Sequence, residues 1–179
     1  GVDTLNQSLA ITVNAVNDAP VASGNASLAS ISEDSTNPAG ALISALFSAN
    51  FSDATDSVAG GSSANSFLGV AITANAATAA QGTWQWSADG TSWTSIATSL
   101  SSSSALFLAT TTSLRFLPAA NFNGTPGSLT TRLVDDSAAA INGSSVNVST
   151  SGGITCFSTN TVVLSTSITA VNDAPVASG

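Results

Sequence analysis

The chain has 179 residues, of which 43% are apolar and only 7% are charged, and its formal net charge at pH 7 is −8. Ten acidic residues face two cations, Arg115 and Arg132, so almost nothing is present to neutralise phosphates or anionic lipid. We therefore expect no nucleic-acid partner. We also expect no membrane insertion, because no apolar run reaches the roughly 18 residues of a spanning helix.

Catalysis is also disfavoured by the composition. His and Lys are both absent, so the common proton shuttles and amine nucleophiles are missing. A carboxylate pair remains, but Asp135 and Asp136 are adjacent, and adjacent strand residues point to opposite faces. We predict that the protein is not an enzyme.

An identical decapeptide, AVNDAPVASG, occupies Ala15–Gly24 and Ala170–Gly179, an offset of 155 residues. A repeat of this length and identity predicts a tandem array. Residues 1–16 are then the last strand of a preceding repeat, 17–173 form one complete repeat, and 174–179 begin the next.

Alternating apolar residues precede both copies of the decapeptide. They are Leu9, Ile11 and Val13 before the first copy, and Leu164 and Ile168 before the second. The shared phase predicts that both segments are the last strand of a repeat. The first segment would have unpaired backbone groups, so we expect it to pair with a neighbouring copy or with its own domain.

Helical patterning is nearly missing between these two segments. Pro38–Phe51 is the best helical candidate, with Leu42, Leu46 and Phe47 expected on one face, and it allows at most two turns. Elsewhere the apolar period is two, which is typical of strands. Strands are predicted at Leu68–Thr73, Ala105–Leu108, Ser113–Leu117, Ser128–Val134, Ser145–Ser149 and Thr161–Ala170. This pattern predicts an all-β fold, an antiparallel Greek-key β-sandwich with at most one short helix.

The clearest hairpin is GTWQWSADGTSWTSI. Trp84 and Trp86 alternate on its first strand, Gly90 supplies the turn, and Trp93 lies on the return. The three tryptophans are interpreted as a core sheet or, alternatively, as an aromatic platform for a sugar. The absence of Tyr and His favours the core.

Acidic side chains fall at turns and at the ends of predicted elements. They are Glu33, Asp34, Asp53, Asp56, Asp135 and Asp136, together with the pairs Asn17–Asp18 and Asn172–Asp173. Calcium takes six to eight oxygen ligands, and short Asp and Asn side chains on loops supply them. We weigh a Ca²⁺ cofactor equally against caps and Asx-turns that need no metal.

Several motifs together resemble the cadherin-like tandem repeats of giant bacterial extracellular adhesins and surface fibre proteins. The joint AVNDAPV follows a strand, ISEDS and FSDATDS supply acidic turns, and LRFLPAANFNGTPGSLTTRLVDDS matches the family's aromatic-Pro-Ala-Asn-Phe-Asn-Gly strand and turn. The resemblance covers most of the chain. It implies a cadherin- or Ig-like sandwich strung head to tail at the bacterial cell surface, with calcium stiffening the joints.

The same resemblance implies a ligand arrangement. Glu33, Asp53, Asp135 or Asp136, and the pair Asn172–Asp173 would lie near one joint. Asn17 and Asp18 would belong to the other joint.

Two functions follow as expectations. The first is a structural repeat of an extracellular fibre or adhesin stalk, whose partners are neighbouring copies, joined covalently or by strand exchange. The alternative is a carbohydrate-binding adhesin module with a glycan or surface target. The single cysteine, Cys156, lies in an apolar run and is interpreted as a buried core residue, with an intermolecular crosslink as the alternative.

Overall fold

The computed structural model describes residues 1, 3–4, 7–59 and 61–175. It is a mostly β fold with one short helix, and most of its strand pairs are antiparallel. The helical elements are α1 (Ile43–Phe47) and two 3₁₀ turns, η1 (Ser48–Asn50) and η2 (Ala54–Asp56). The strands are β1 (Val21–Ala22), β2 (Ala26–Ser27), β3 (Ile31–Ser32), β4 (Ala41–Leu42), β5 (Phe51–Ser52), β6 (Phe67–Asn75), β7 (Gly82–Ser87), β8 (Thr94–Ser95), β9 (Ala105–Ala109), β10 (Ser113–Pro118), β11 (Leu129–Asp135), β12 (Ser145–Val146), β13 (Val162–Ser165) and β14 (Ile168–Thr169).

Two sheets supply one hydrophobic core. The smaller has the order β4-β10-β7-β8, and the larger has the order β12-β9-β6-β11-β13-β2. Trp84 and Phe116 from the smaller sheet and Val70 and Leu133 from the larger are fully buried in the same cluster. The predicted strands at Leu68–Thr73, Ala105–Leu108, Ser113–Leu117 and Ser128–Val134 are confirmed as β6, β9, β10 and β11. Of the predicted strand Ser145–Ser149 only Ser145–Val146 is present, and Thr161–Ala170 is divided into β13 and β14. Leu114 and Phe116 of β10, and Val162 and Leu164 of β13, are buried at the alternate positions expected of a strand.

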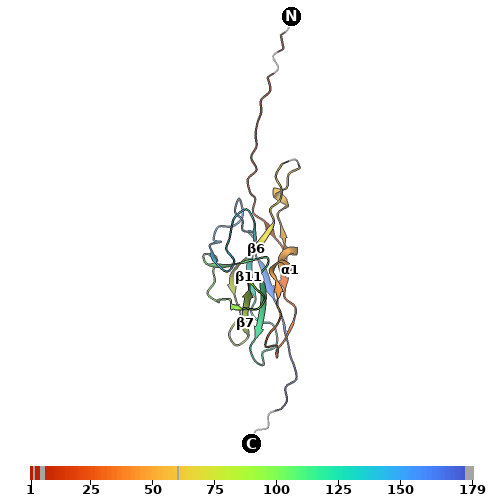
Figure 1. The fold of residues 1–179 in the computed structure, drawn as a ribbon, viewed down its shortest axis with the longest axis vertical. Helices are drawn as coiled ribbons and strands as arrows, with labels where there is room; N and C mark the ends of the chain where they lie inside the picture. Colours follow the sequence, from red (N-terminus) through yellow and green to blue (C-terminus); the bar gives the residue numbers. More distant parts are fainter. Residues whose placement is uncertain (2, 5–6, 60, 176–179) are drawn as a thin grey trace.

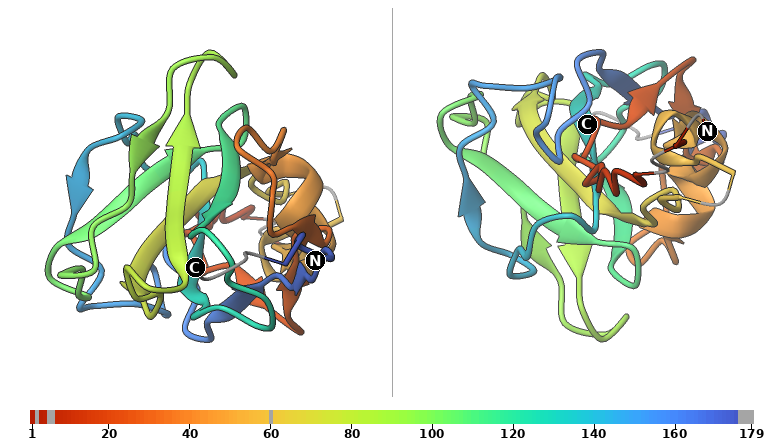
Figure 2. Two further views of the ribbon diagram at one scale, coloured as in Figure 1. Left: turned by 90° about the horizontal axis from the view of Figure 1, so that it is seen from below. Right: turned by 90° about the horizontal axis from the view of Figure 1, so that it is seen from above.

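The larger sheet is covered on both faces. Val70 and Ile72 of β6 enter the main core, whereas Ala71 between them joins a second cluster with Phe107 and Val148. A strand that is covered on both faces has a continuous apolar sequence, as β6 has in FLGVAI. Seen along the long axis, α1 lies on one side of the body and β12 on the other (Figure 2).

The helix lies where the sequence predicted one, but its buried face differs. Ile43 and Phe47 are four residues apart and fully buried. Leu42, expected on the buried face with Leu46, is instead 45% exposed. The reason is that Leu42 is the extended residue before the first turn (φ −67°, ψ 145°), so its side chain is outside the helical phase.

The tryptophan hairpin has the turn that the sequence predicted. Gly90 adopts φ +73°, and Asp89 organises the bend by accepting hydrogen bonds from the backbone amides of Ser92 and Thr91 at 2.7 and 2.8 Å. The Ser87 hydroxyl adds a third bond at 2.9 Å. These donors hold the pKa of Asp89 far below its usual value.

Two strand pairs that join the beginning of the repeat to its end are parallel, unlike the antiparallel pairing expected throughout. β13 pairs in parallel with β2, and β14 pairs in parallel with β3. Because both ends of the repeat follow this common direction, the chain enters and leaves at opposite ends of the body (Figure 1). We call these ends the N-terminal pole (Asn17, Asp18, Asp53, Asp56 and Asp135) and the C-terminal pole (Glu33, Asn123 and Val171).

Candidate metal centre at the N-terminal pole

Five of the predicted ligands lie near one another where the chain enters the body. Asp53 directly precedes η2, Asp56 is the last residue of η2, and Asp135 is the last residue of β11. The backbone amide of Asp18 donates to Asp56 Oδ1 at 2.9 Å, so the entering segment is bonded directly to the acidic turn. The resemblance placed Asp18 and Asp53 at different joints, whereas in the structure Asp18 is bonded to Asp56, which lies beside Asp53.

Each buried carboxylate at this pole uses one oxygen and leaves the other without a partner. Asp53 Oδ2 accepts from the Asn65 amide at 2.5 Å, and Asp135 Oδ1 accepts from the amide and hydroxyl of Ser137 at 2.8 and 2.5 Å. The unpartnered buried oxygens are Asp53 Oδ1, Asp56 Oδ2, Asp135 Oδ2 and Asn17 Oδ1. A buried acceptor without a donor costs about 1–3 kcal/mol, and more when charged, so a cation or water beside these four oxygens would stabilise the folded chain.

The electrostatics of Asp53 agree with this interpretation. The three carboxylates are 4%, 6% and 0% exposed at Asp53, Asp56 and Asp135. Burial raises the pKa of Asp53, and the nearby charges of Asp56 and Asp135 raise it further. The two arginines bond neutral oxygens instead, Arg115 with Gln85 and Asn37, and Arg132 with backbone carbonyls.

The donor set suits calcium in chemistry, because it consists only of carboxylate and amide oxygens. In the described part of the chain, however, no three Asp, Glu or Cys side chains meet closely enough to form a metal centre by themselves. The charges of Asp56 and Asp135 affect the pKa of Asp53, but the three carboxylates do not converge on one point. A bound ion would therefore need the Asn17 amide oxygen, backbone carbonyls and water to complete its ligand sphere.

Asp136 has a different role from Asp135. Its Oδ1 accepts from the Asn65 side chain and the Ser66 amide, both at 2.9 Å, and these bonds lower the pKa of Asp136. Asn65 was not predicted, although its amide and side chain connect Asp53 with Asp136. Its only sequence signal is an Asn two residues before an apolar strand, which is a common loop feature.

The remaining predicted ligands lie at the opposite pole. Glu33 Oε1 accepts from the backbone amide of Val171 at 2.6 Å, and its Oε2 accepts from the Asn123 side chain at 3.2 Å. Asp34 is exposed, as are Asn172 and Asp173 beyond the last strand. Glu33 therefore does not share a site with Asp53 in this chain, contrary to the expectation from the resemblance.

The tryptophans do not form a common exposed platform. Trp84 is fully buried, packs edge-on against Phe116 with ring centroids 5.2 Å apart, and donates its Nε1–H to the Gly127 carbonyl at 2.8 Å. Trp86 is partly buried against the same core, and the Arg115 guanidinium lies 4.0 Å from the Trp93 ring centroid. The core interpretation of Trp84 is confirmed, and a sugar platform that includes it is excluded.

The predicted strand-pairing segment pairs with no part of the described chain. Leu9, Ile11 and Val13 are 84%, 76% and 88% exposed. Residues 7–14 run away from the body as an extended trace (Figure 1). Their counterparts one period later, Leu164 and Ile168, are 0% and 4% exposed. The matched phase is thus confirmed for the second segment, and a pairing partner for the first stays a prediction.

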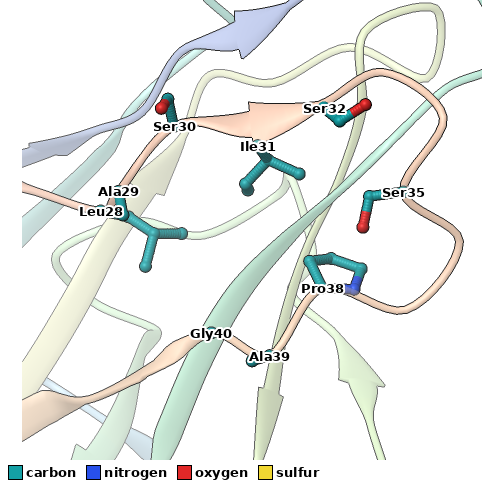
Figure 3. A pocket seen from close by; sticks show the side chains of 9 residues that line it. All are labelled: Leu28, Ala29, Ser30, Ile31, Ser32, Ser35, Pro38, Ala39 and Gly40. Carbon is teal, nitrogen blue, oxygen red and sulfur yellow. The ribbon is translucent and has the colours of Figure 1, made fainter.

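The hollows of the described surface are shallow and open. A hollow of about 320 Å³ lies between β3 and the segment before β4, with Leu28 and Ile31 directed into it and Ser30 and Ser32 away from it (Figure 3). Its lining contains no charged side chain. Cys156 is elsewhere, buried in the second cluster as predicted, and burial raises the pKa of its thiol.

In a buffer containing a chelator, the free energy of unfolding is expected to fall as the pH rises through the raised pKa of Asp53. Between its ordinary value of 3.8 and the raised value, the folded protein holds a proton that the unfolded chain has released, so raising the pH removes stability. Asp136 acts in the opposite direction, and only below 3.8, because its pKa is lowered. Urea unfolding between about pH 4 and pH 7 measures the effect.

The matched variant for this experiment is Asp53→Asn, which keeps an acceptor for the Asn65 amide. It is expected to flatten the pH dependence above 3.8, the ordinary value for Asp53. A fall of the same size in native protein and in Asp53→Asn would show that Asp53 is not the titrating group.

The fold and this pole together define a mostly β domain with an acidic entry point. Within the described ranges, no helix has both the length and the apolar character to cross a membrane. Comparisons with protein-family models, with curated proteins and with solved structures give no match to the chain.

Proposed function

We propose that the chain carries one structural repeat of an extracellular fibre or adhesin stalk at a bacterial cell surface. In this proposal the repeat is a cadherin-like Greek-key β-sandwich, joined head to tail to neighbouring copies and stiffened by calcium at the joints. It has a mechanical role and performs no catalysis. One observation carries the proposal: residues 17–19 are bonded into one pole, whereas their equivalents 172–174 are exposed at the other.

The first copy of the decapeptide is integrated into the N-terminal pole. Asn17 Nδ2 donates to the Thr155 carbonyl at 3.3 Å, and the Ala19 amide donates to the Gly153 carbonyl at 2.6 Å. Val21 and Ala22 then pair with β5. The segment is thus bonded both to the glycine-containing loop and to the acidic turn, and it serves as the opening segment of the domain.

The second copy has the same side chains but none of these contacts in the described chain. Asn172 Nδ2 donates only to the carbonyl of the next residue, Asp173, at 3.3 Å, and the side chains through Pro175 are exposed. Residues 176–179, the remainder of the predicted next repeat, lie outside the described residues. A following copy of residues 17–171 would supply the missing partners, which supports a head-to-tail array.

Calcium belongs to this proposal because of the four buried oxygens without partners at the N-terminal pole. Asp53, Asp56, Asp135 and Asn17 are its expected ligands. They lie where the preceding repeat would end, so an ion bound there would hold the entering segment against the acidic turn.

A chain lengthened by one period tests the proposal. Residues 17–171 are inserted a second time after Val171, so that each joint keeps the natural sequence. We expect two folded units, with a β-type circular dichroism spectrum per residue equal to that of the native chain. Small-angle scattering should show a longer particle of unchanged cross-section. A second period that stays unfolded, or a doubled particle that is round, would contradict the proposal.

A further inference from the structure

The inference that follows rests on the proposed head-to-tail array and concerns its joint. Val171 is bonded to its own repeat, through its backbone amide and Glu33 Oε1 at 2.6 Å. The next residue, Asn172, is the equivalent of Asn17, which is bonded to Thr155 of the repeat that it opens. Consecutive residues would therefore be fixed to consecutive repeats, with no free linker between them.

The two residues that precede this asparagine, Ala170 and Val171 or their equivalents Ala15 and Val16, would lie against both repeats. Ala15 and Val16 line a hollow of about 120 Å³ together with Asp56, Ser62 and Ser63. Their equivalents, Ala170 and Val171, directly follow β14, which pairs with β3. In an array, Ser62 and Ser63 of the following repeat and Glu33 of the preceding repeat would lie against the same short segment. The two poles are then held close together.

The surfaces that would meet are an apolar projection and a hollow. At the N-terminal pole, Val58 is 59% exposed in a turn closed by bonds from its amide to the Ser62 carbonyl at 3.0 Å and from the Gly61 amide to its own carbonyl at 2.9 Å. This turn extends from the body alongside the entering segment (Figure 1). At the C-terminal pole, a hollow of about 400 Å³ is lined by Glu33, Asp34, Leu117, Pro118, Ala120 and Asn121, among others.

We propose that this hollow at the C-terminal pole binds the Val58 turn of the following copy. Leu117, Pro118 and Ala120 supply apolar surface for the valine, and the exposed Asp34 lies on the same rim that the serine-rich turn would occupy. An exposed valine that enters such a hollow is removed from water, which favours contact without any ion. The partner is a second copy of this chain's own repeat.

The chain lengthened by one period, here called the doubled chain, contains one joint and two free poles. Substitutions at the free poles therefore serve as controls for substitutions at the joint. With calcium present, we expect ¹⁵N relaxation to give one common rotational correlation time for both units. With segmental labelling, nuclear Overhauser contacts are expected between the second unit's Val58 methyls and the first unit's Ala120 methyl. Ala120→Trp in the first unit, and separately Val58→Ser in the second, should abolish these contacts and the common tumbling. Both residues are exposed, so neither change should unfold a unit.

The same substitutions at the free poles are the matched controls. Ala120→Trp in the second unit and Val58→Ser in the first are expected to leave tumbling and contacts unchanged. Two folded units that tumble independently in the unsubstituted chain, or equal effects at joint and free poles, would overturn this inference and leave the proposed repeat intact. Failure of the second unit to fold would instead count against the proposed function.

Discussion

Replacing Trp84 with alanine is expected to lower the free energy of unfolding by about 3–5 kcal/mol, the largest effect of any single change considered for this molecule. Trp84 is fully buried between the two large sheets and packs edge-on against Phe116. Its indole N–H is the donor for the Gly127 carbonyl at 2.8 Å. The variant loses the packed ring, leaves a cavity and removes that donor.

Urea unfolding followed by circular dichroism measures this loss, with Trp93→Ala as the control. Trp93 is partly buried and contacts the Arg115 guanidinium, so its removal should cost only about 0.5–2 kcal/mol. Trp84→Phe should fall between the two, because it keeps an aromatic ring but leaves the Gly127 carbonyl without its donor. Equal losses for Trp84→Ala and Trp93→Ala would refute the core assignment.

The strands of the two large sheets could be predicted because their signal is local. In β6, β9 and β11, an alternating or a continuous run of apolar residues indicates which side chains face a core. The turn at Gly90 is equally local, since an Asp-Gly bend needs only its own donors and φ > 0. The phase match of the segments ending at Ala15 and Ala170 also came from sequence, and Leu164 and Ile168 are buried as it required.

The parallel pairing of β2 with β13 and of β3 with β14 could not be predicted, because it depends on contacts between residues more than 130 positions apart. Leu164 opposes Ala26, and Ile168 opposes Ile31. Nothing in either short segment specifies the direction of its partner. Yet this pairing is what sends the chain in at one pole and out at the other.

The residues of the candidate site could be named from the sequence more accurately than which of them lie together. Turn-forming acids were recognised from residue type alone, but Asp18 is brought to Asp56 only by the tertiary fold. Glu33 looks equivalent to Asp53 in sequence, since both lie in short acidic turns. Its carboxylate instead accepts the Val171 amide and the Asn123 side chain, which places it at the other pole.

Calcium is expected to stabilise the native chain by about 2.7 kcal/mol when its concentration is 100 times the dissociation constant, by mass action on the folded state. The physical reason is the group of four buried oxygens without donors at the N-terminal pole. A divalent ion near Asp53, Asp56 and Asp135, with the Asn17 amide oxygen, backbone carbonyls and water completing its ligand sphere, would offset the repulsion among the three carboxylates. Thermal unfolding with calcium and with a chelator measures the shift, and isothermal titration calorimetry gives the dissociation constant. Absence of any shift at saturating calcium would remove the ion from the proposal.

Asp135→Asn separates binding at this pole from general screening of an acidic protein. The amide keeps an oxygen for the Ser137 amide and hydroxyl, but the free carboxylate oxygen and its charge are gone. In chelator the variant should therefore be as stable as the native chain or more stable, and calcium should no longer raise its melting temperature. Asp34→Asn removes the same charge from an exposed turn at the opposite pole and should leave the calcium response unchanged. If both variants lose the response equally, the ion acts through the net charge of −8 and not through the buried carboxylates.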